Sequence, residues 1–225
     1  MGKIIIQDYT TKNPITMIGT EAGVCYGSDI SDKEKNYKRG IQCLKDGHGR
    51  TWEFPDVYMI IDGYSARLMR EIYTHIGGSP TRNQASTRYI NYQKGFDYFT
   101  PPSIEDNLAA KVIYDDVMAY ILDGLKKLES LGIKKEDSAN LLPLGMESKM
   151  VGKYNFRTLS DMSHQRMCTR AYHEYRKFFN DLCNALREYS NEWAYLVDNY
   201  FMPKCELFGY CTEKFSCGRK DKKDE

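Results

Sequence analysis

The spacing of hydrophobic and polar residues predicts strands toward the start of the chain and long helices toward its end. Short apolar or β-rich runs predict strands at residues 3–9, 15–26, 57–61 and 89–92. Apolar residues that recur with the helical period, together with capping residues, predict helices at residues 31–44, 65–73, 104–128, 155–189 and 191–201. Residues 140–152 are expected to form a connector. We therefore predict an α+β fold rather than a regular βαβ series.

Composition narrows the class of protein. A length of 225 residues suits one domain, and we expect a single catalytic domain at 1–203 followed by a charged, cysteine-containing tail at 204–225 that is frayed. A net charge of +1 argues against general polyanion binding. The sequence has no apolar run long enough to span a membrane, and its first residues do not resemble a signal peptide. We therefore expect a cytoplasmic protein whose cysteines are thiols.

The polar stretch Thr81–Tyr92, T-R-N-Q-A-S-T-R-Y-I-N-Y, is the main candidate for ligand binding. It follows a Gly-Gly-Ser-Pro loop and is rich in side chains that donate directed hydrogen bonds. Arginine guanidinium groups fit phosphate in a bidentate way. Ser86 and Arg88 are two residues apart, so in an extended backbone both would point to one side, as phosphate binding needs. An ordinary polar turn is the alternative interpretation.

Residues 155–189, interpreted as one helix, carry a second candidate. An apolar stripe at helical spacing runs through Cys168, Tyr172, Tyr175, Phe179, Leu182 and Leu186. Extended toward the start of the helix, the stripe meets Asp161 and Arg157, while Arg166 lies on the opposite side. Polar groups confined to the first turns indicate that this end lines a site. Simple solvent exposure of these turns is the alternative.

Both candidate stretches resemble signatures of one family. R-N-Q-A-S-T-R-Y is similar to the signature of flavin-dependent thymidylate synthases, although Thr74-His75-Ile76 replaces the family's Arg-His-Arg. N-F-R-T-L-S-D-M-S-H-Q-R resembles the second signature of the family, with matches at Asn155, Arg157 and Arg166. Gly47-His48 and Glu53 resemble a third segment. Three signatures in the family's order are fairly specific.

The resemblance implies an activity and a fold. The family converts dUMP to dTMP, with methylenetetrahydrofolate as carbon donor and NADPH-reduced FAD as the hydride source. It implies a mixed or antiparallel sheet packed with long helices, and a homotetramer with sites between subunits. Two alternatives stay open: a family variant that methylates or hydroxymethylates another pyrimidine nucleotide, and a non-catalytic nucleotide-binding homologue.

The resemblance also implies a set of site residues. Arg166 would be catalytic, since the matching arginine binds the pyrimidine and helps to ionise it. The dUMP-binding residues would be Glu71, Gln84, Ala85, Ser86, Thr87, Arg88 and Arg166. The FAD-binding residues would be His48, Arg50, Thr74, His75, Ile76, Arg82, Asn83, Gln84, Asn155, Arg157 and Asp161. Because phosphates need counter-charge, we expect Arg82, with Arg50 or Arg70, to replace the missing family arginines.

Three tail cysteines, Cys205, Cys211 and Cys217, are evenly spaced, with five residues between each pair. Zinc sites take four ligands, commonly with C-x-x-C spacing. This spacing differs, and no histidine follows to complete the set. We therefore expect free thiols in the tail and no metal site.

Overall fold

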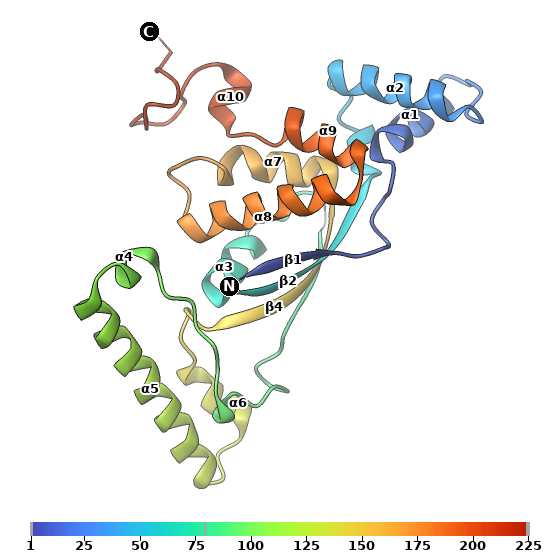
Figure 1. Cartoon of the computed structure of the whole chain (residues 1–225). Coiled ribbons are helices and arrows are strands. Elements are labelled where there is room, and N and C mark those ends of the chain that lie inside the picture. Colours follow the sequence, from blue (N-terminus) through green and yellow to red (C-terminus); the bar gives the residue numbers. More distant parts are fainter. Residues whose placement is uncertain (1, 79, 224–225) are drawn as a thin grey trace. The chain divides into compact units, whose positions relative to one another are not determined.

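The computed structural model describes residues 2–78 and 80–223. A four-stranded antiparallel sheet has the strand order β1-β2-β4-β3 (Figure 1). The strands are β1 (Lys3–Ile6), β2 (Asp56–Ser65), β3 (Thr81–Gln84) and β4 (Glu147–Asn155). Helices make up most of the remaining regular structure, which confirms the predicted α+β class.

The long helices are α1 (Pro14–Cys25), α2 (Lys33–Lys45), α3 (Ala66–Tyr73), α5 (Leu108–Ser130), α7 (Phe156–Arg166), α8 (His173–Tyr189) and α9 (Asn191–Tyr200). The single-turn helices are α4 (Pro102–Glu105), α6 (Lys135–Ser138) and α10 (Lys204–Phe208). Three 3-10 turns complete the described elements: η1 (Thr51–Glu53), η2 (Tyr92–Lys94) and η3 (Ala139–Leu141). None of the helices in the described ranges is long and apolar enough to cross a membrane.

The chain divides into two compact units, each formed from separate segments. The first unit contains Ile61–Thr74 and Asn83–Met150, with the described residues up to Lys3. The second unit contains Ile4–Ile60, His75–Arg82 and the described residues from Val151 onward. The chain passes from one unit to the other within each of the four strands and again after Thr74.

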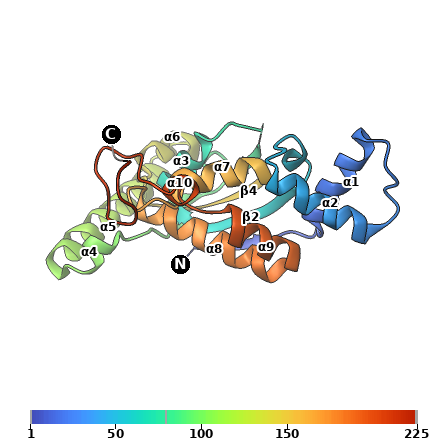
Figure 2. The same ribbon diagram turned by 90° about the horizontal axis from the view of Figure 1, so that it is seen from above.

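An aromatic core holds the second unit together. Phe156, the first residue of α7, is completely buried and stacks on Phe201 with 6.0 Å between ring centroids. Trp193 of α9 is equally buried, and its indole N–H donates a hydrogen bond to the Thr11 carbonyl oxygen over 2.7 Å. Helices α8 and α9 lie side by side in both ribbon views (Figures 1 and 2). This layer supports the start of α7, which carries several candidate residues.

Residues 15–25 belong to helix α1 and not to the strand predicted at residues 15–26. Pro14 stands in the first turn, where its missing N–H costs nothing, and Ile15, Ile18 and Ala22 follow the helical spacing and are buried. A Cβ at Gly19 would lie 1.8 Å from the Asn36 carbonyl oxygen of α2. The glycine therefore lets the two helices approach closely, and this packing decides the helical conformation.

The predicted helix at residues 155–189 is two helices, α7 and α8. Asn155 is the N-cap of α7, so it lies at the end of β4 and not inside a helix. In the connection, the Thr169 and Ala171 carbonyl oxygens accept hydrogen bonds from the Arg176 guanidinium instead of from the backbone of a continuous helix. The continuous stripe linking Arg157 and Asp161 to the aromatic residues of α8 is therefore wrong.

Other predicted boundaries also change. Residues 140–152 contain the start of β4, whose alternating buried and exposed residues are a strand pattern. Residues 89–92 form a turn, and the nearby strand is Thr81–Gln84. The helix at 104–128 is interrupted, because Asn107 caps a new helix by accepting from the backbone N–H of Ala110. The helix predicted at residues 31–44 is α2, and its N-cap is Asp32 and not Ser31 at the start of the predicted range.

The helices predicted at residues 65–73 and 191–201 are present as α3 and α9. Ser65 caps α3, where its side chain accepts a hydrogen bond from the backbone N–H of Leu68 over 3.1 Å. Helix α9 occupies the predicted range. The tail, expected to fray, instead contains α10 and an isolated β-bridge between Cys211 and Lys222.

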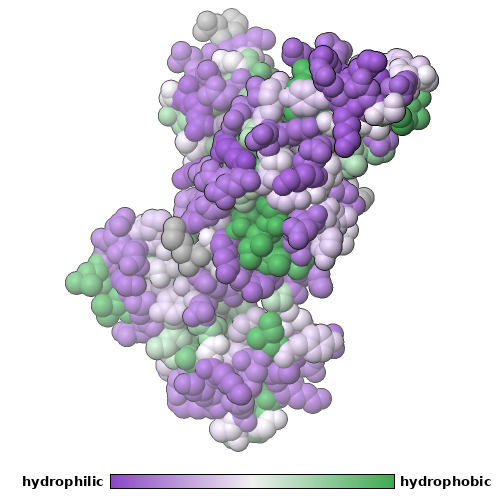
Figure 3. Space-filling view, turned by 45° about the vertical axis from the view of Figure 1, so that its right-hand side comes forward, coloured by the Kyte–Doolittle hydropathy of each residue, from purple (hydrophilic) through white to green (hydrophobic). Residues whose placement is uncertain are grey.

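On the face shown in Figure 3, hydrophobic areas are separated by hydrophilic surface.

Candidate functional site

Arg166, the last residue of α7, contacts His75 within the second unit. Its Nε donates a hydrogen bond to Nε2 of His75 over 2.9 Å. Its guanidinium carbon lies 4.7 Å from the centroid of the Tyr175 ring, and that ring also meets the His75 ring edge-to-face. Arg166 is thus held between an imidazole acceptor and an aromatic face, two favourable neighbours for a guanidinium group.

His75 is neutral at physiological pH. Burial, followed by the charges of Arg166 and Arg82, lowers the pKa of His75 to about 4. Arg82 also donates a hydrogen bond to the His75 backbone oxygen over 3.1 Å. Because Nε2 accepts the bond from Arg166, the single proton of the neutral ring belongs on Nδ1. The imidazole can therefore orient the guanidinium without adding a positive charge.

A glycine turn seats the His75 segment on the start of α7. The Thr158 hydroxyl donates a hydrogen bond to the Gly77 carbonyl oxygen over 2.9 Å. Gly78 has a φ of +68°, and a Cβ there would lie 2.3 Å from Oγ1 of Thr158. Asn155 caps the same helix turn by accepting from the Thr158 backbone N–H over 2.8 Å. Helix α7 therefore positions His75 through its first turn and Arg166 through its last residue.

A second group of predicted residues gathers around Glu53 of η1, also in the second unit. One terminal nitrogen of Arg157 lies 2.7 Å from the Glu53 carboxylate, and one of Arg50 lies 3.3 Å from it. His48 belongs to the preceding loop, where its carbonyl oxygen accepts a hydrogen bond from a neighbouring hydroxyl. A Cβ at Gly49 would lie 3.4 Å from the Arg157 guanidinium carbon. The loop backbone therefore passes close to a basic side chain at the start of α7.

The start of the predicted substrate loop is anchored to β4 within the first unit. The Gln84 side-chain amide donates a hydrogen bond to Oγ of Ser148 over 3.1 Å. The Ala85 backbone N–H donates to the Lys149 carbonyl oxygen over 2.8 Å. Ser148 is buried, so the amide of Gln84 has a fixed partner.

Residues 86–90 form a tight turn and not the extended segment that was predicted. The backbone N–H groups of Tyr89 and Ile90 both donate to the Ser86 carbonyl oxygen, over 3.2 and 3.1 Å. The Ser86 hydroxyl accepts from the Arg88 backbone N–H over 3.2 Å. The Arg88 guanidinium forms an exposed ion pair with Glu136 at 3.4 Å. A turn, and not the two-residue repeat of a strand, therefore brings Ser86 and Arg88 together.

The remaining candidates lie at other places in the fold. Glu71 is in α3 and forms an ion pair at 3.8 Å with an arginine one turn earlier in the helix. Thr74 caps the end of α3 and donates its hydroxyl to the Glu71 carbonyl oxygen over 2.7 Å. Ile76 is 75% exposed, and Asp161 is an exposed residue of α7. Asn83 belongs to β3.

The structure brings together three subsets of the predicted residues. The second unit joins His75, Arg82 and Arg166, and it joins Arg50 and Arg157 through Glu53. The first unit contains the loop from Gln84 through Thr87 to Arg88. Several contacting residues were not predicted as part of the site: Tyr175, Ser148, Glu136 and Thr158. No sequence signal could have found them, because folding alone brings them to these positions.

Comparison with known proteins places the chain in a family. Residues 6–190 match the family described as thymidylate synthase complementing protein. This match covers most of the sequence and includes every candidate site residue. The chain belongs to this family.

Curated relatives in two bacteria carry the name flavin-dependent thymidylate synthase. The protein of Nitratidesulfovibrio vulgaris is 29% identical over 231 residues, covering 93% of this chain and 91% of that protein. The protein of Clostridium tetani is 26% identical over 242 residues, covering 96% of this chain and 93% of that protein. The family suggested by the three signatures is therefore confirmed.

Solved structures share the fold. A crystal structure of thymidylate synthase X from Helicobacter pylori with FAD and dUMP aligns with a TM-score of 0.64 and 19% identity. The alignment covers 89% of this chain and 99% of that chain. A second Helicobacter pylori structure, also complexed with FAD and dUMP, aligns with a TM-score of 0.66 and 18% identity. At this level of identity, the likeness supports the fold.

Proposed function

We propose that the chain converts dUMP to dTMP, with methylenetetrahydrofolate as carbon donor and NADPH-reduced FAD as the source of hydride. One observation carries the proposal. In a chain of the thymidylate synthase complementing family, Arg166 is held by a neutral His75 at the end of α7. This arrangement suits the stabilisation of a negative charge that develops on a pyrimidine ring.

Arg166 is the proposed catalytic residue. A uracil ring becomes a better nucleophile when its N3 proton is lost, and a guanidinium beside the ring stabilises the resulting anion. The hydrogen bond from Nε of Arg166 to His75 fixes the orientation of the guanidinium group. The Tyr175 ring limits rotation of the same group. The chain thereby supplies orientation and charge before the substrate arrives.

The loop of Gln84, Ala85, Ser86, Thr87 and Arg88 is the proposed phosphate site. Glu71 and Arg166 complete the proposed dUMP-binding set. Support comes from the turn at Ser86, in which the Ser86 hydroxyl accepts a hydrogen bond from the Arg88 backbone N–H, so that both residues belong to one short turn. Because Arg88 pairs with an exposed carboxylate, phosphate binding would exchange one weak surface ion pair for a charge-assisted contact.

The residues of the second unit fit the chemistry of FAD. Arg50, Arg157 and His48 are donors suited to a pyrophosphate, and Glu53 offsets only part of their positive charge. The glycine backbone at Gly49 allows a close approach. We propose that these residues bind FAD together with Thr74, His75, Ile76, Arg82, Asn83, Gln84, Asn155 and Asp161. Bound FAD would supply the hydride-transfer chemistry.

We further propose that Arg82 replaces one of the missing family arginines. It donates to the His75 backbone and is a source of the charge that lowers the pKa of His75. Arg82 therefore lies beside His75, the residue that contacts the proposed catalytic Arg166. Arg50 is the second proposed replacement, because it shares Glu53 with Arg157, whereas Arg70 is exposed on α3.

The assembly and location of the protein are also proposals. We propose a homotetramer, supported by exposed large apolar side chains along α5, where Leu108 is 79% exposed and Tyr120 76%. We propose a cytoplasmic location, where dUMP, NADPH and folate are available. We propose that residues 1–203 act as one catalytic domain, followed by the cysteine-containing tail.

An anaerobic turnover reaction tests the function. Purified protein is incubated with FAD, NADPH, methylenetetrahydrofolate and equal amounts of dUMP and UMP, and the products are identified by mass spectrometry. We expect thymidine monophosphate alone. The Arg166→Lys variant should bind flavin but turn over much more slowly, while the matched control Arg187→Lys on α8 should behave as the parent. A methylated ribonucleotide, a hydroxymethyl product, or no product despite bound flavin would contradict the proposal.

A further inference from the structure

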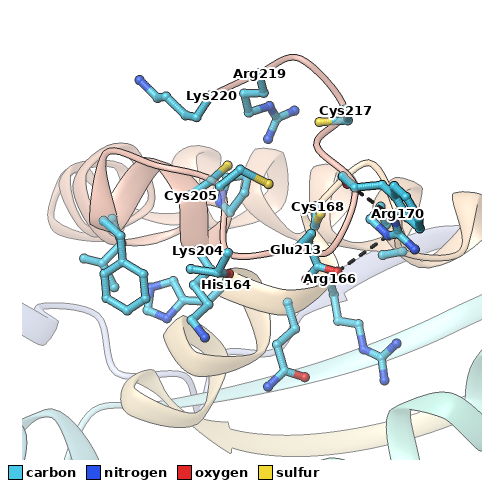
Figure 4. Close-up of a pocket in the computed structure, with 18 of the residues that line it drawn as sticks. His164, Arg166, Cys168, Arg170, Lys204, Cys205, Glu213, Cys217, Arg219 and Lys220 are labelled. Atoms are coloured by element: carbon cyan, nitrogen blue, oxygen red, sulfur yellow. Dashed lines mark hydrogen bonds and ion pairs between the residues drawn. The ribbon is translucent and has the colours of Figure 1, made fainter. Parts of the chain in front are cut away.

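Four cysteines line one cavity at the end of the second unit. The cavity has a volume of about 800 Å³ and lies between the end of α7, the loop that follows it, and the tail. Cys205, Cys211 and Cys217 come from the tail, and Cys168 comes from the loop after α7. Figure 4 shows the Cys168, Cys205 and Cys217 side chains around this cavity. The fourth thiol that the tail sequence lacks is therefore supplied by a distant part of the chain.

Ionic contacts hold the tail beside Cys168. The Arg170 guanidinium lies 3.5 Å from the Glu213 carboxylate and donates to the Phe215 carbonyl oxygen over 3.3 Å (Figure 4). Both tail residues stand between Cys211 and Cys217, while Arg170 is two residues from Cys168.

The tail has no hydrophobic core to explain its fold. No residue from Lys204 to Lys223 is buried, and Leu207 and Phe215 are 52% and 65% exposed. Yet the segment turns back on itself, with the Cys211 backbone N–H donating to the Asp221 carbonyl oxygen over 2.7 Å. Surface ion pairs contribute little to such a fold. Small segments of this kind are normally stabilised by disulfides or a metal ion.

We propose that Cys168, Cys205, Cys211 and Cys217 form a structural Zn²⁺ site that fixes the tail to the end of α7. Four thiolates are a common ligand set of structural zinc sites. In a reducing compartment, grouped cysteines favour metal binding over disulfides. On binding, four thiols release four protons and form a complex with a net charge of 2−. The same metal would anchor the loop that follows Arg166.

The surroundings suit such a complex. Basic side chains that line the cavity outnumber acidic ones five to two, which favours thiolates and a dianionic centre. Among residues 2–78 and 80–223, no three His, Cys, Asp or Glu side chains are already arranged to hold a metal ion. The sulfurs therefore have to converge when the ion binds.

Metal analysis of the full-length protein tests the proposal. The reduced protein is stripped with a chelator and reloaded with Zn²⁺ alone, and bound zinc is counted by mass spectrometry of the element. We expect about one ion per chain. Each of the four Cys→Ser variants should bind at least tenfold more weakly. Cys25→Ser, which changes an exposed cysteine of α1, is the matched control and should bind as the parent does.

Three further measurements keep the test independent of misfolding. Cys217→His offers another zinc ligand and should retain the metal, whereas Cys217→Ser should not. Cobalt in place of zinc should give the sulfur-to-metal charge-transfer absorption of thiolate ligands. Loss of the metal should speed tryptic cleavage in the tail.

The proposal is overturned if the reduced parent binds no stoichiometric zinc, if Cys168→Ser binds zinc as tightly as the parent, or if these cysteines are found paired as disulfides.

Discussion

The charge state of His75 can be tested directly. Its ring accepts a hydrogen bond from Arg166, and its pKa of about 4 is well below the ordinary value of 6.5. The unfolded chain therefore takes up a proton on this residue at a pH where the folded chain does not. The resulting stability is fully present above about pH 6.5 and is lost as the pH falls toward about 4.

The structure sets the size of this effect. Each factor of ten in proton affinity is worth about 1.4 kcal/mol, so the depressed pKa of His75 corresponds to about 3 kcal/mol. The ring is only partly buried, and water screens some of the interaction. We therefore expect the free energy of unfolding to decrease by about 2 kcal/mol between about pH 7.5 and about pH 4.5 because of His75.

Comparison with His75→Gln isolates this contribution from that of the carboxylates. Glutamine stays neutral and still offers Arg166 an acceptor. Urea unfolding followed by tryptophan fluorescence should show that the parent loses its stability advantage over the variant as the pH falls. Direct titration of His75 by NMR gives its pKa. In Arg166→Met this pKa should rise but stay below 6.5, since burial is its main cause, while Arg187→Met should leave it unchanged. Titration of His75 near 6.5 in the parent would refute the reasoning.

Three further outcomes are expected. Arg82→Ala should weaken the binding of both dUMP and flavin about tenfold in titrations. The control Arg70→Ala, which changes an exposed arginine, should leave both affinities as they are. Unchanged affinities in Arg82→Ala would show that Arg82 replaces no family arginine. Gly78→Ala should lower the free energy of unfolding by about 1–3 kcal/mol, because Gly78 has a positive φ and its Cβ would collide with Thr158 of α7. The control Gly77→Ala has open space around its Cβ and should be nearly neutral in thermal unfolding. Ser148→Ala should raise the KM for dUMP a few-fold with little change in kcat, because the amide of the substrate loop loses its partner; an unchanged KM would count against this loop as the nucleotide site.

Local sequence was informative where one residue determines local geometry. The sequence predicted a helix from residue 65, and Ser65 caps α3 because a serine hydroxyl can satisfy the first free backbone N–H groups of a helix. The same reasoning failed for α1, because its conformation depends on close packing of Gly19 against α2, and that contact is invisible along the chain. It also failed between α7 and α8, where the side chain of Arg176 satisfies the carbonyl oxygens of the connection.

The sequence by itself determined the family and the candidate site residues, because motifs record which side chains the chemistry needs. Only the tertiary structure decided which of them meet. Arg166 and His75 are 91 positions apart, and their hydrogen bond exists because a glycine turn seats one segment on the helix that carries the other. The sequence showed three evenly spaced cysteines in the tail, and folding placed Cys168 at the same cavity. Contacts between distant segments depend on packing, and packing is a property of the whole fold.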